Sequence, residues 1–239
     1  MRLVAALVLA AFALSACQTT QELSAERAKT AKKLVHQKGL TVGKKNPNVA
    51  IGATAVIRDK NGIAAVVELR NTGHDAQADL PVSIAITDKA GKQVYKNDVA
   101  GLEDSLVSMP LLTRGEDAYW VNNQITATGT PAKVQAKVGA AKGRVPAEVP
   151  RFAISAVALG SDTDGVYVKG TIVNRSKVAQ KRLTIFCVAR RGGRIVAAGR
   201  AILDSLGPSG AKPARFTVFF IGNPKGATLS FSAPPTVLE

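Results

Sequence analysis

Apolar and polar residues alternate along several segments of the chain with a period of two. Residues 63–70, 82–87 and 185–189 each place apolar side chains at every second position. This period is typical of antiparallel strands that have one face covered by a partner sheet. The covered positions are predicted to be Ile63, Ala65, Val67 and Leu69, then Val82, Ile84 and Ile86, and finally Ile185, Cys187 and Ala189.

Turn signals separate these predicted strands. Asn61-Gly62 and Asp164-Gly165 are favoured centres of two-residue hairpins, because both residues of each pair tolerate a positive φ. Gly192-Gly193 serves a further hairpin. The spacing of strands and turns predicts six or seven short strands in each half of the chain, as in a β-sandwich.

The chain contains an internal repeat. The segment that begins at Val49, Val-Ala-Ile-Gly-Ala-Thr-Ala-Val, returns 103 positions later at Phe152 as Phe-Ala-Ile-Ser-Ala-Val-Ala-Leu. The same offset pairs Asp59 with Asp162, Gly62 with Gly165, Asn71 with Asn174 and Leu80 with Leu183. Asp104-Ser105-Leu106 returns as Asp204-Ser205-Leu206, and we expect a tight turn at both. Each copy, of about 90 residues, is long enough to close its own core.

These patterns predict an all-β protein with two tandem antiparallel β-sandwich domains of immunoglobulin-like architecture. The predicted parts are a signal peptide over 1–16, a basic tether over 17–47, domain 1 over 48–139, a linker over 140–150 and domain 2 over 151–239. The linker boundary follows from three Ala, two Gly and two Pro between residues 139 and 150.

The second copy resembles a known family of small extracellular domains. Gly170-Thr-Ile-Val-Asn-Arg-Ser, then Leu183-Thr-Ile and Gly193-Arg-Ile-Val, are similar to segments of the FxLYD family, although the Phe-x-Leu-Tyr-Asp motif itself is absent. The tandem arrangement looks like the immunoglobulin-like or fibronectin-like domains of bacterial envelope proteins. This resemblance implies binding or spacer modules without enzymatic activity.

The N-terminus is predicted to be an export signal. Arg2 is followed by an unbroken apolar stretch over 3–14, which is too short for the roughly 20 residues of a membrane-spanning helix. Leu14-Ser15-Ala16-Cys17 resembles the lipobox of bacterial lipoproteins. In that family a diacylglycerol is attached to the Cys, here Cys17, after which the signal is cleaved. The alternative is ordinary secretory cleavage after Ser15, which leaves Cys17 as a free thiol.

Charge is distributed unevenly along the chain, which carries +15 overall. The segment 18–47 has seven basic and two acidic residues, and it is either attracted to anionic headgroups or a solubilising spacer. Domain 1 has a net charge of −1, whereas domain 2 has +9. Two groups of basic residues near opposite ends of domain 2 are candidate anion-binding residues: Arg175, Lys177, Lys181 and Arg182, and then Arg190, Arg191 and Arg194.

The remaining chemistry-bearing residues favour structural roles. His36 and His74 have no second ligand at metal spacing, and the Asp59 and Asp162 turns lack the further ligands of a calcium loop. Cys187 is predicted to be a buried hydrophobic residue, and Trp120 a core residue. The sequence therefore predicts no catalytic site, no metal and no cofactor.

The sequence thus predicts a lipid-anchored protein of the bacterial envelope, on the extracytoplasmic side of a membrane, either periplasmic or extracellular. Its function would be that of a non-enzymatic binding or spacer module. The alternatives are a lipid-anchored hydrolase and an accessory subunit of an envelope complex. The expected partners are a membrane, through the anchor, and an anionic envelope polymer, lipid headgroups or an acidic protein, but not nucleic acid, which would favour one continuous basic stripe.

Overall fold

A computed structural model describes residues 39–146 and 148–237 of this chain. The contacts group the chain from Gly39 onward into one compact unit. The predicted signal peptide, the lipid-attachment candidate Cys17, His36 and most of the predicted tether lie outside the described residues. Within the described part of the chain, no helix combines the length and apolar character that crossing a membrane requires.

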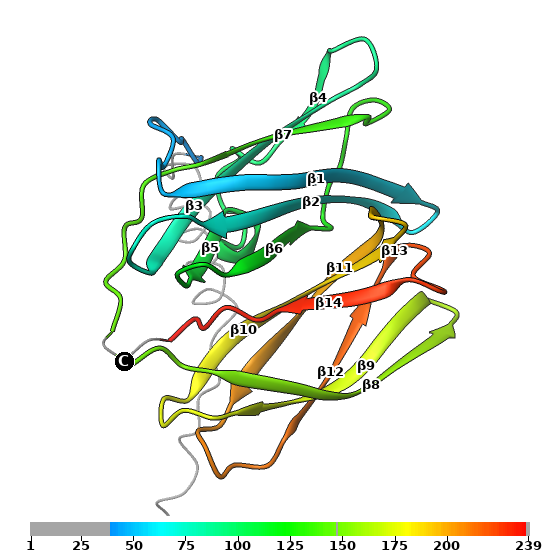
Figure 1. Cartoon of the computed structure of the whole chain (residues 1–239). Helices are drawn as coiled ribbons and strands as arrows, with labels where there is room; N and C mark the ends of the chain where they lie inside the picture. The colour runs from blue at the N-terminus through cyan, green and yellow to red at the C-terminus, as the bar shows by residue number, and fades with distance from the viewer. Residues whose placement is uncertain (1–38, 147, 238–239) are drawn as a thin grey trace, which may run out of the picture. The chain divides into compact units, whose positions relative to one another are not determined.

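The first half of the folded unit is a sandwich of antiparallel strands (Figure 1). One sheet has the order β1-β2-β6, formed by Val49–Asp59, Gly62–Asn71 and Asp117–Asn122. The opposite sheet is centred on β3, Gln77–Thr87, which pairs with β4, β5 and β7, formed by Gln93–Lys96, Ser108–Leu112 and Lys133–Val138. A single 3-10 turn, η1, covers Asp104–Leu106 between β4 and β5.

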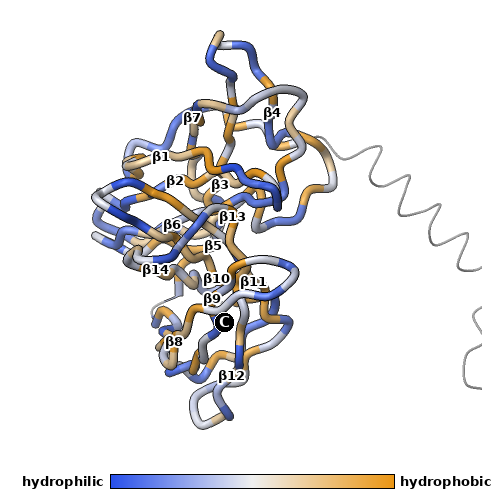
Figure 2. Tube along the Cα trace, turned by 90° about the vertical axis from the view of Figure 1, so that its right-hand side faces the viewer, coloured by the Kyte–Doolittle hydropathy of each residue, from blue (hydrophilic) through white to orange (hydrophobic). Residues whose placement is uncertain are grey.

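The second half repeats this design. One sheet has the order β12-β9-β8, formed by Ala214–Phe219, Gly165–Asn174 and Phe152–Asp162. The other has the order β13-β11-β10-β14, formed by Ile221–Gly222, Arg194–Leu206, Gln180–Arg191 and Thr228–Ser232. The predicted all-β, antiparallel sandwich architecture is therefore confirmed. Figure 2 shows hydrophobic residues along the strands and hydrophilic residues in many turns between them.

The internal repeat is also present in the geometry. β8 and β9 begin and end 103 positions after β1 and β2. All three predicted hairpins are present, and the turn at Gly192-Gly193 is confirmed, but the other two turns are centred one residue earlier than predicted, on Lys60-Asn61 and Thr163-Asp164, because Gly62 and Gly165 already pair with Asp59 and Asp162. Asn71 and Asn174 end their strands as predicted. The Asn71 amide donates to the Asp75 carbonyl at 2.8 Å, and the Asn174 amide donates to the Val178 carbonyl at the same distance.

The inward positions form the core that the alternation predicts. In the first sandwich, Val67 on β2 pairs with Trp120 on β6, and both side chains are fully buried. In the second sandwich, Leu183, Ile185 and Cys187 of β10 are fully buried in a separate apolar cluster. The predictions for Trp120 and Cys187 are confirmed.

The opposite faces of the central strands differ from what the alternation predicts. Ala64 and Val66 of β2 point away from the first core, yet both are fully buried. They belong to one apolar cluster with Phe186 and Val188, the outward residues of β10. Sheet β1-β2-β6 therefore packs against sheet β13-β11-β10-β14, and the folded unit is built of four stacked layers (Figure 1).

This packing qualifies the prediction of two independent domains. The second sandwich has its own core, but it also covers a sheet of the first with Phe186, Val188, Ala198 and Ile221. The segment 39–47, predicted as part of the tether, belongs to the folded unit as well. Asn46 is buried, its backbone N–H donates to the Val138 carbonyl at 2.8 Å, and its side-chain amide donates to Gly139 at 3.2 Å.

The repeated Asp-Ser-Leu sequence does not form the same structure twice. Asp104–Leu106 is the η1 turn, whereas Asp204-Ser205-Leu206 is the last part of the long strand β11, so the turn predicted there is wrong. Residues at equivalent places along β3 and β10 explain this difference. Gln77 pairs with Leu112, and Gln180 pairs with Leu206, so the end of β11 corresponds to β5 and not to η1.

Burial makes Cys187 a sensitive reporter of the second core. Burial raises the pKa of the Cys187 thiol far above its usual range. In the unfolded chain the thiol ionises above about pH 8.5, so its contribution to stability is complete below that pH and is lost as the pH rises. Between pH 7.5 and pH 9.5, we expect the free energy of unfolding to fall by about 1.4 kcal/mol more in the parent than in Cys187→Ala.

The measurement is urea unfolding of both proteins at pH 7.5 and pH 9.5 under reducing conditions. At pH 7.5, Cys187→Ala should cost about 1 kcal/mol because it removes buried volume. An identical pH dependence of the two proteins, or rapid labelling of Cys187 by a thiol reagent in the native state, would contradict the buried assignment.

Candidate functional site

Two of the predicted anion-binding residues join the two sandwiches. Arg182, at the start of β10, forms an ion pair with Glu103, just before η1. Arg190, near the end of β10, forms an ion pair with Glu68 of β2 at 2.8 Å. The guanidinium of Arg190 also lies 5.5 Å from the centre of the Tyr119 ring, within the range of a cation–π contact. These two arginines therefore contact the acidic first half of the same chain.

Arg200 of β11 is the central polar contact between the sandwiches. Its side chain is only 4% exposed, and its Nη2 lies 3.1 Å from Glu103 Oε2. Its Nε donates to Asn123 Oδ1 at 3.0 Å, and its Nη1 donates to the hydroxyl of Ser105. A buried guanidinium is tolerated when a carboxylate and further acceptors satisfy its donors.

Sequence reasoning did not single out Arg200. The signal is present in the chain, because Arg200 is the only charged residue between Ile195 and Leu203 in an otherwise apolar strand. A lone charge in such a run indicates either a solvent-facing position or a buried ion pair. Choosing between the two requires knowing that the outer face of β11 is covered.

The other candidate anion-binding residues remain at the surface. Arg191 donates to the backbone carbonyls of Asn223 and Lys225, so it stabilises the loop between β13 and β14 of its own sandwich. Arg175 and Lys177 lie in the loop between β9 and β10, and Arg194 begins β11, and all three are exposed. As the spacing predicts, the two groups lie toward opposite ends of β10.

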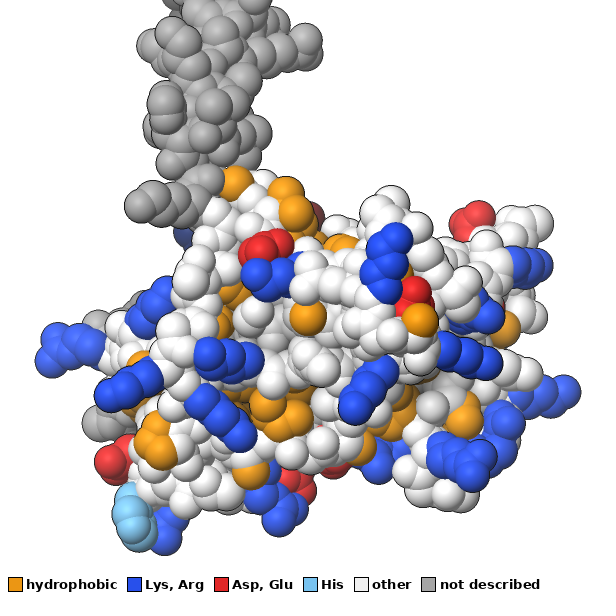
Figure 3. Space-filling model, turned by 90° about the horizontal axis from the view of Figure 1, so that it is seen from above, with side chains coloured by type: hydrophobic (Ala, Val, Ile, Leu, Met, Phe, Trp, Pro, Cys, Tyr) orange, Lys and Arg blue, Asp and Glu red, His pale blue; other side chains and the backbone are white. Residues whose placement is uncertain are grey.

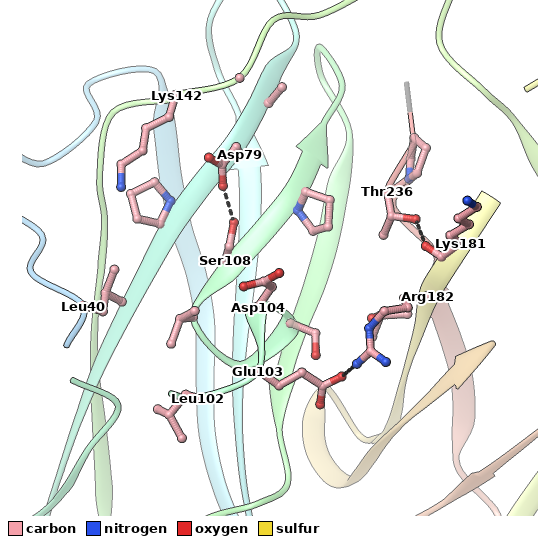
Figure 4. Close-up of a pocket in the computed structure, with 18 residues that line it drawn as sticks. Leu40, Asp79, Leu102, Glu103, Asp104, Ser108, Lys142, Lys181, Arg182 and Thr236 are labelled. Atoms are coloured by element: carbon pink, nitrogen blue, oxygen red, sulfur yellow. Dashed lines mark hydrogen bonds and ion pairs between the residues drawn. The ribbon is translucent and has the colours of Figure 1, made fainter. Parts of the chain in front are cut away.

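A groove between the two sandwiches has a volume of about 650 Å³. Its first-sandwich wall comes from β3, η1 and β5 together with Lys142 and Gly143, and its second-sandwich wall from Lys181, Arg182 and Thr184 with Pro235 and Thr236. Figure 4 shows Asp79, Glu103 and Asp104 on one side and Lys181 and Arg182 on the other. The predicted residues Lys181 and Arg182 are thus part of this groove.

Internal contacts order several of the groove side chains. The Ser108 hydroxyl donates to Asp79 at 2.9 Å, and the Thr236 hydroxyl donates to the Lys181 carbonyl at 2.6 Å. Asp104 and Lys181 are exposed, with no ion pair among the residues that the structure describes. The groove therefore offers a free carboxylate and a free ammonium on opposite walls, with apolar Leu40, Leu102 and Pro110 beside them.

The other residues considered for chemistry have structural contacts. Asp59 Oδ1 accepts from the Asn61 N–H at 2.7 Å, and Asp162 Oδ1 accepts from the Asp164 N–H at 2.9 Å, as the turn interpretation predicts. His74 is exposed in the loop after β2. Among residues 39–146 and 148–237, no group of three His, Cys, Asp or Glu side chains is placed to hold a metal.

No family model matches this chain, and neither does any curated protein. The lipobox and FxLYD resemblances therefore stay predictions from the sequence.

Proposed function

We propose that this protein is a lipid-anchored component of a bacterial envelope that serves as a non-enzymatic binding module. Cys17 would carry the lipid, and the segment after it would connect the membrane to the two sandwiches. The observation that carries the binding role is the groove between them. Its volume of about 650 Å³ is within the range of ligand sites, which is roughly 300 to 1,000 Å³.

The contacts that close the interface support this role. Arg200, Glu103 and Ser105 fix η1 against β11 directly beside the groove. A groove whose walls are held in one arrangement loses little conformational freedom on binding, and this favours affinity. Asp104 and Lys181 on opposite walls suit a ligand that carries both a basic and an acidic group, such as a segment of another envelope protein.

Anchoring is tested first. Cys17→Ser should leave the protein uncleaved or released from the membrane, because a single thiol carries the predicted anchor. Fractionation of cells and mass spectrometry of the N-terminal peptide measure this. An unmodified Cys17 thiol on the mature wild-type protein would overturn the anchoring proposal.

Crosslinking in intact cells that express the wild-type protein tests the binding role. A photo-crosslinking amino acid placed at Asp104 or Lys181 should capture one discrete partner, whereas the same amino acid at Lys89, exposed on the first sandwich and outside the groove, should not. Capture of the same species from all three positions, or from none, would count against the groove as the binding site.

A further inference from the structure

Five basic residues gather at one end of the second sandwich and form what we call the basic end. The backbone N–H of Arg175 donates to the Arg151 carbonyl at 2.8 Å, so the loop after β9 lies beside the start of β8. Ser209 donates to Ser176 at 2.7 Å, which brings the loop after β11 to the same place. The basic end consists of Arg151, Arg175, Lys177, Lys212 and Arg215.

Within the described residues, no acidic side chain forms an ion pair with the basic end. None of its five side chains takes part in an ion pair there, in contrast to Arg182, Arg190 and Arg200. Asp162 and Asp164 lie at the hairpin that opens β9, about 30 Å along the strand from Asn174 at about 3.3 Å per residue. Asp204 belongs to the opposite sheet, on β11. These five side chains therefore combine into a local positive field.

Exposed apolar side chains lie farther along the same sheet. Val157 and Leu159 of the edge strand β8 are 43% and 44% exposed, but Leu159 pairs with the buried Val168 and therefore lies on the opposite face of the sheet from Lys169. Phe219 of β12 is 38% exposed and contacts Tyr167 edge to face. Cations next to an exposed aromatic side chain suit the boundary between headgroups and acyl chains.

Within residues 39–146 and 148–237, the outer face of sheet β12-β9-β8 is exposed, whereas its counterpart in the first sandwich is covered. In the first sandwich the equivalent face is covered, and its Val66 and Val121 are fully buried against the second sandwich. At the position of Val66 the second sandwich has Lys169, which is exposed and lies over the Tyr167 ring at 4.5 Å. The same scaffold thus presents a covered apolar face in one copy and an open basic face in the other.

We propose that the basic end and the exposed outer face of sheet β12-β9-β8 dock the folded unit on an anionic membrane surface. Exposed apolar side chains gain from contact with lipid, whereas a hydrated acidic polymer offers them nothing comparable. A second copy of the chain is disfavoured. The face that it would offer by analogy with the internal interface, the outer side of β3, β4 and β7, carries Lys96, Lys133 and Lys137. Figure 3, seen from that side, shows many Lys and Arg side chains and few acidic ones.

The effect of docking is large enough to measure. Each Lys or Arg near an anionic surface strengthens binding about fivefold at moderate salt. With an anchor at Cys17, the basic end would be a second attachment that holds the sandwiches against the membrane. Without the anchor it should still give measurable binding, so this proposal stands or falls separately from the lipidation of Cys17.

The test uses the chain from residue 18 onward, without the acylated cysteine, and vesicles of phosphatidylcholine with phosphatidylglycerol. Arg175→Gln, Lys177→Gln, Lys212→Gln and Arg215→Gln together should lower the vesicle partition coefficient at least about tenfold. The matched control is Lys60→Gln, Lys89→Gln, Lys92→Gln and Lys133→Gln, which removes the same charge from exposed positions of the first sandwich. We expect the control to retain most of the binding.

A second variant separates lipid from polymer. Phe219→Ser, on the same sheet face as Lys169 and Arg215, should weaken vesicle binding and leave binding to dextran sulfate unchanged. Circular dichroism confirms that each variant is folded. Equal losses in the two four-site variants, binding to dextran sulfate without binding to vesicles, or no vesicle binding by the parent would each overturn the membrane proposal.

Discussion

Expressed alone, residues 151–239 should be poorly soluble and self-associate. Their fold includes a core, but separation from the first sandwich exposes Phe186, Val188, Ala198 and Ile221 on one sheet. Full exposure of a buried Phe or Val side chain costs about 1.5 to 3 kcal/mol each. A contiguous apolar patch of this kind promotes association. Size-exclusion chromatography and binding of a hydrophobic dye would measure this.

The first copy shows which residues should make the isolated fragment soluble. The outward positions of β3 that correspond to Phe186 and Val188 are Ser83 and Ala85, on a face that the second sandwich does not cover. The fragment carrying Phe186→Ser and Val188→Ala should therefore be monomeric. The same substitutions in the chain from residue 18 onward should destabilise it, because there they remove buried contacts. A soluble, monomeric fragment without any substitution would show that the interface is dispensable.

Glu103→Ala should lower the free energy of unfolding of the chain from residue 18 onward by about 3 kcal/mol. Glu103 accepts from both Arg182 and Arg200, and Arg200 is almost fully buried. Removing the carboxylate leaves a buried guanidinium without its counter-charge, which is far more costly than loss of a surface ion pair. Urea denaturation at neutral pH gives the value.

The neighbouring residue provides the control. Asp104→Ala removes an exposed carboxylate that has no ion pair among the described residues, so the change in stability should stay within about 0.5 kcal/mol. Equal effects of the two substitutions would mean that the contact between Glu103 and Arg200 contributes no more than a surface charge does.

Local alternation predicted the strands and the inward core residues of both copies, and the turn residues located the hairpins to within one residue. Alternation of apolar and polar residues predicts the inward face of a strand reliably, because each inward residue contacts the partner sheet of its own sandwich. It failed at Ala64, Val66, Phe186 and Val188, which are outward and still buried. Covering that face depends on the other copy, about one hundred residues away, and alternation within one strand carries no information on such a partner.

The candidate site shows the same limit. The charge difference between the copies indicated an interaction with anions, and for Arg182 and Arg190 the acidic groups in contact belong to the first copy itself. The groove was not predicted, because it is formed by η1, β5, the start of β10 and the C-terminal segment, which are far apart in the sequence. Matching Asp-Ser-Leu sequences also misled, because strand register and not residue identity decides which positions are equivalent.

The difference between the outer faces of β3 and β10 limits how many copies can stack. On β10, the apolar Phe186 and Val188 pack against the preceding sandwich. At the corresponding positions of β3, Ser83 and Ala85 offer too little apolar surface for such packing. An array of these sandwiches has therefore a defined first member, since its exposed sheet cannot recruit another. Two positions on one strand thus decide whether a further copy can add at that end of the stack.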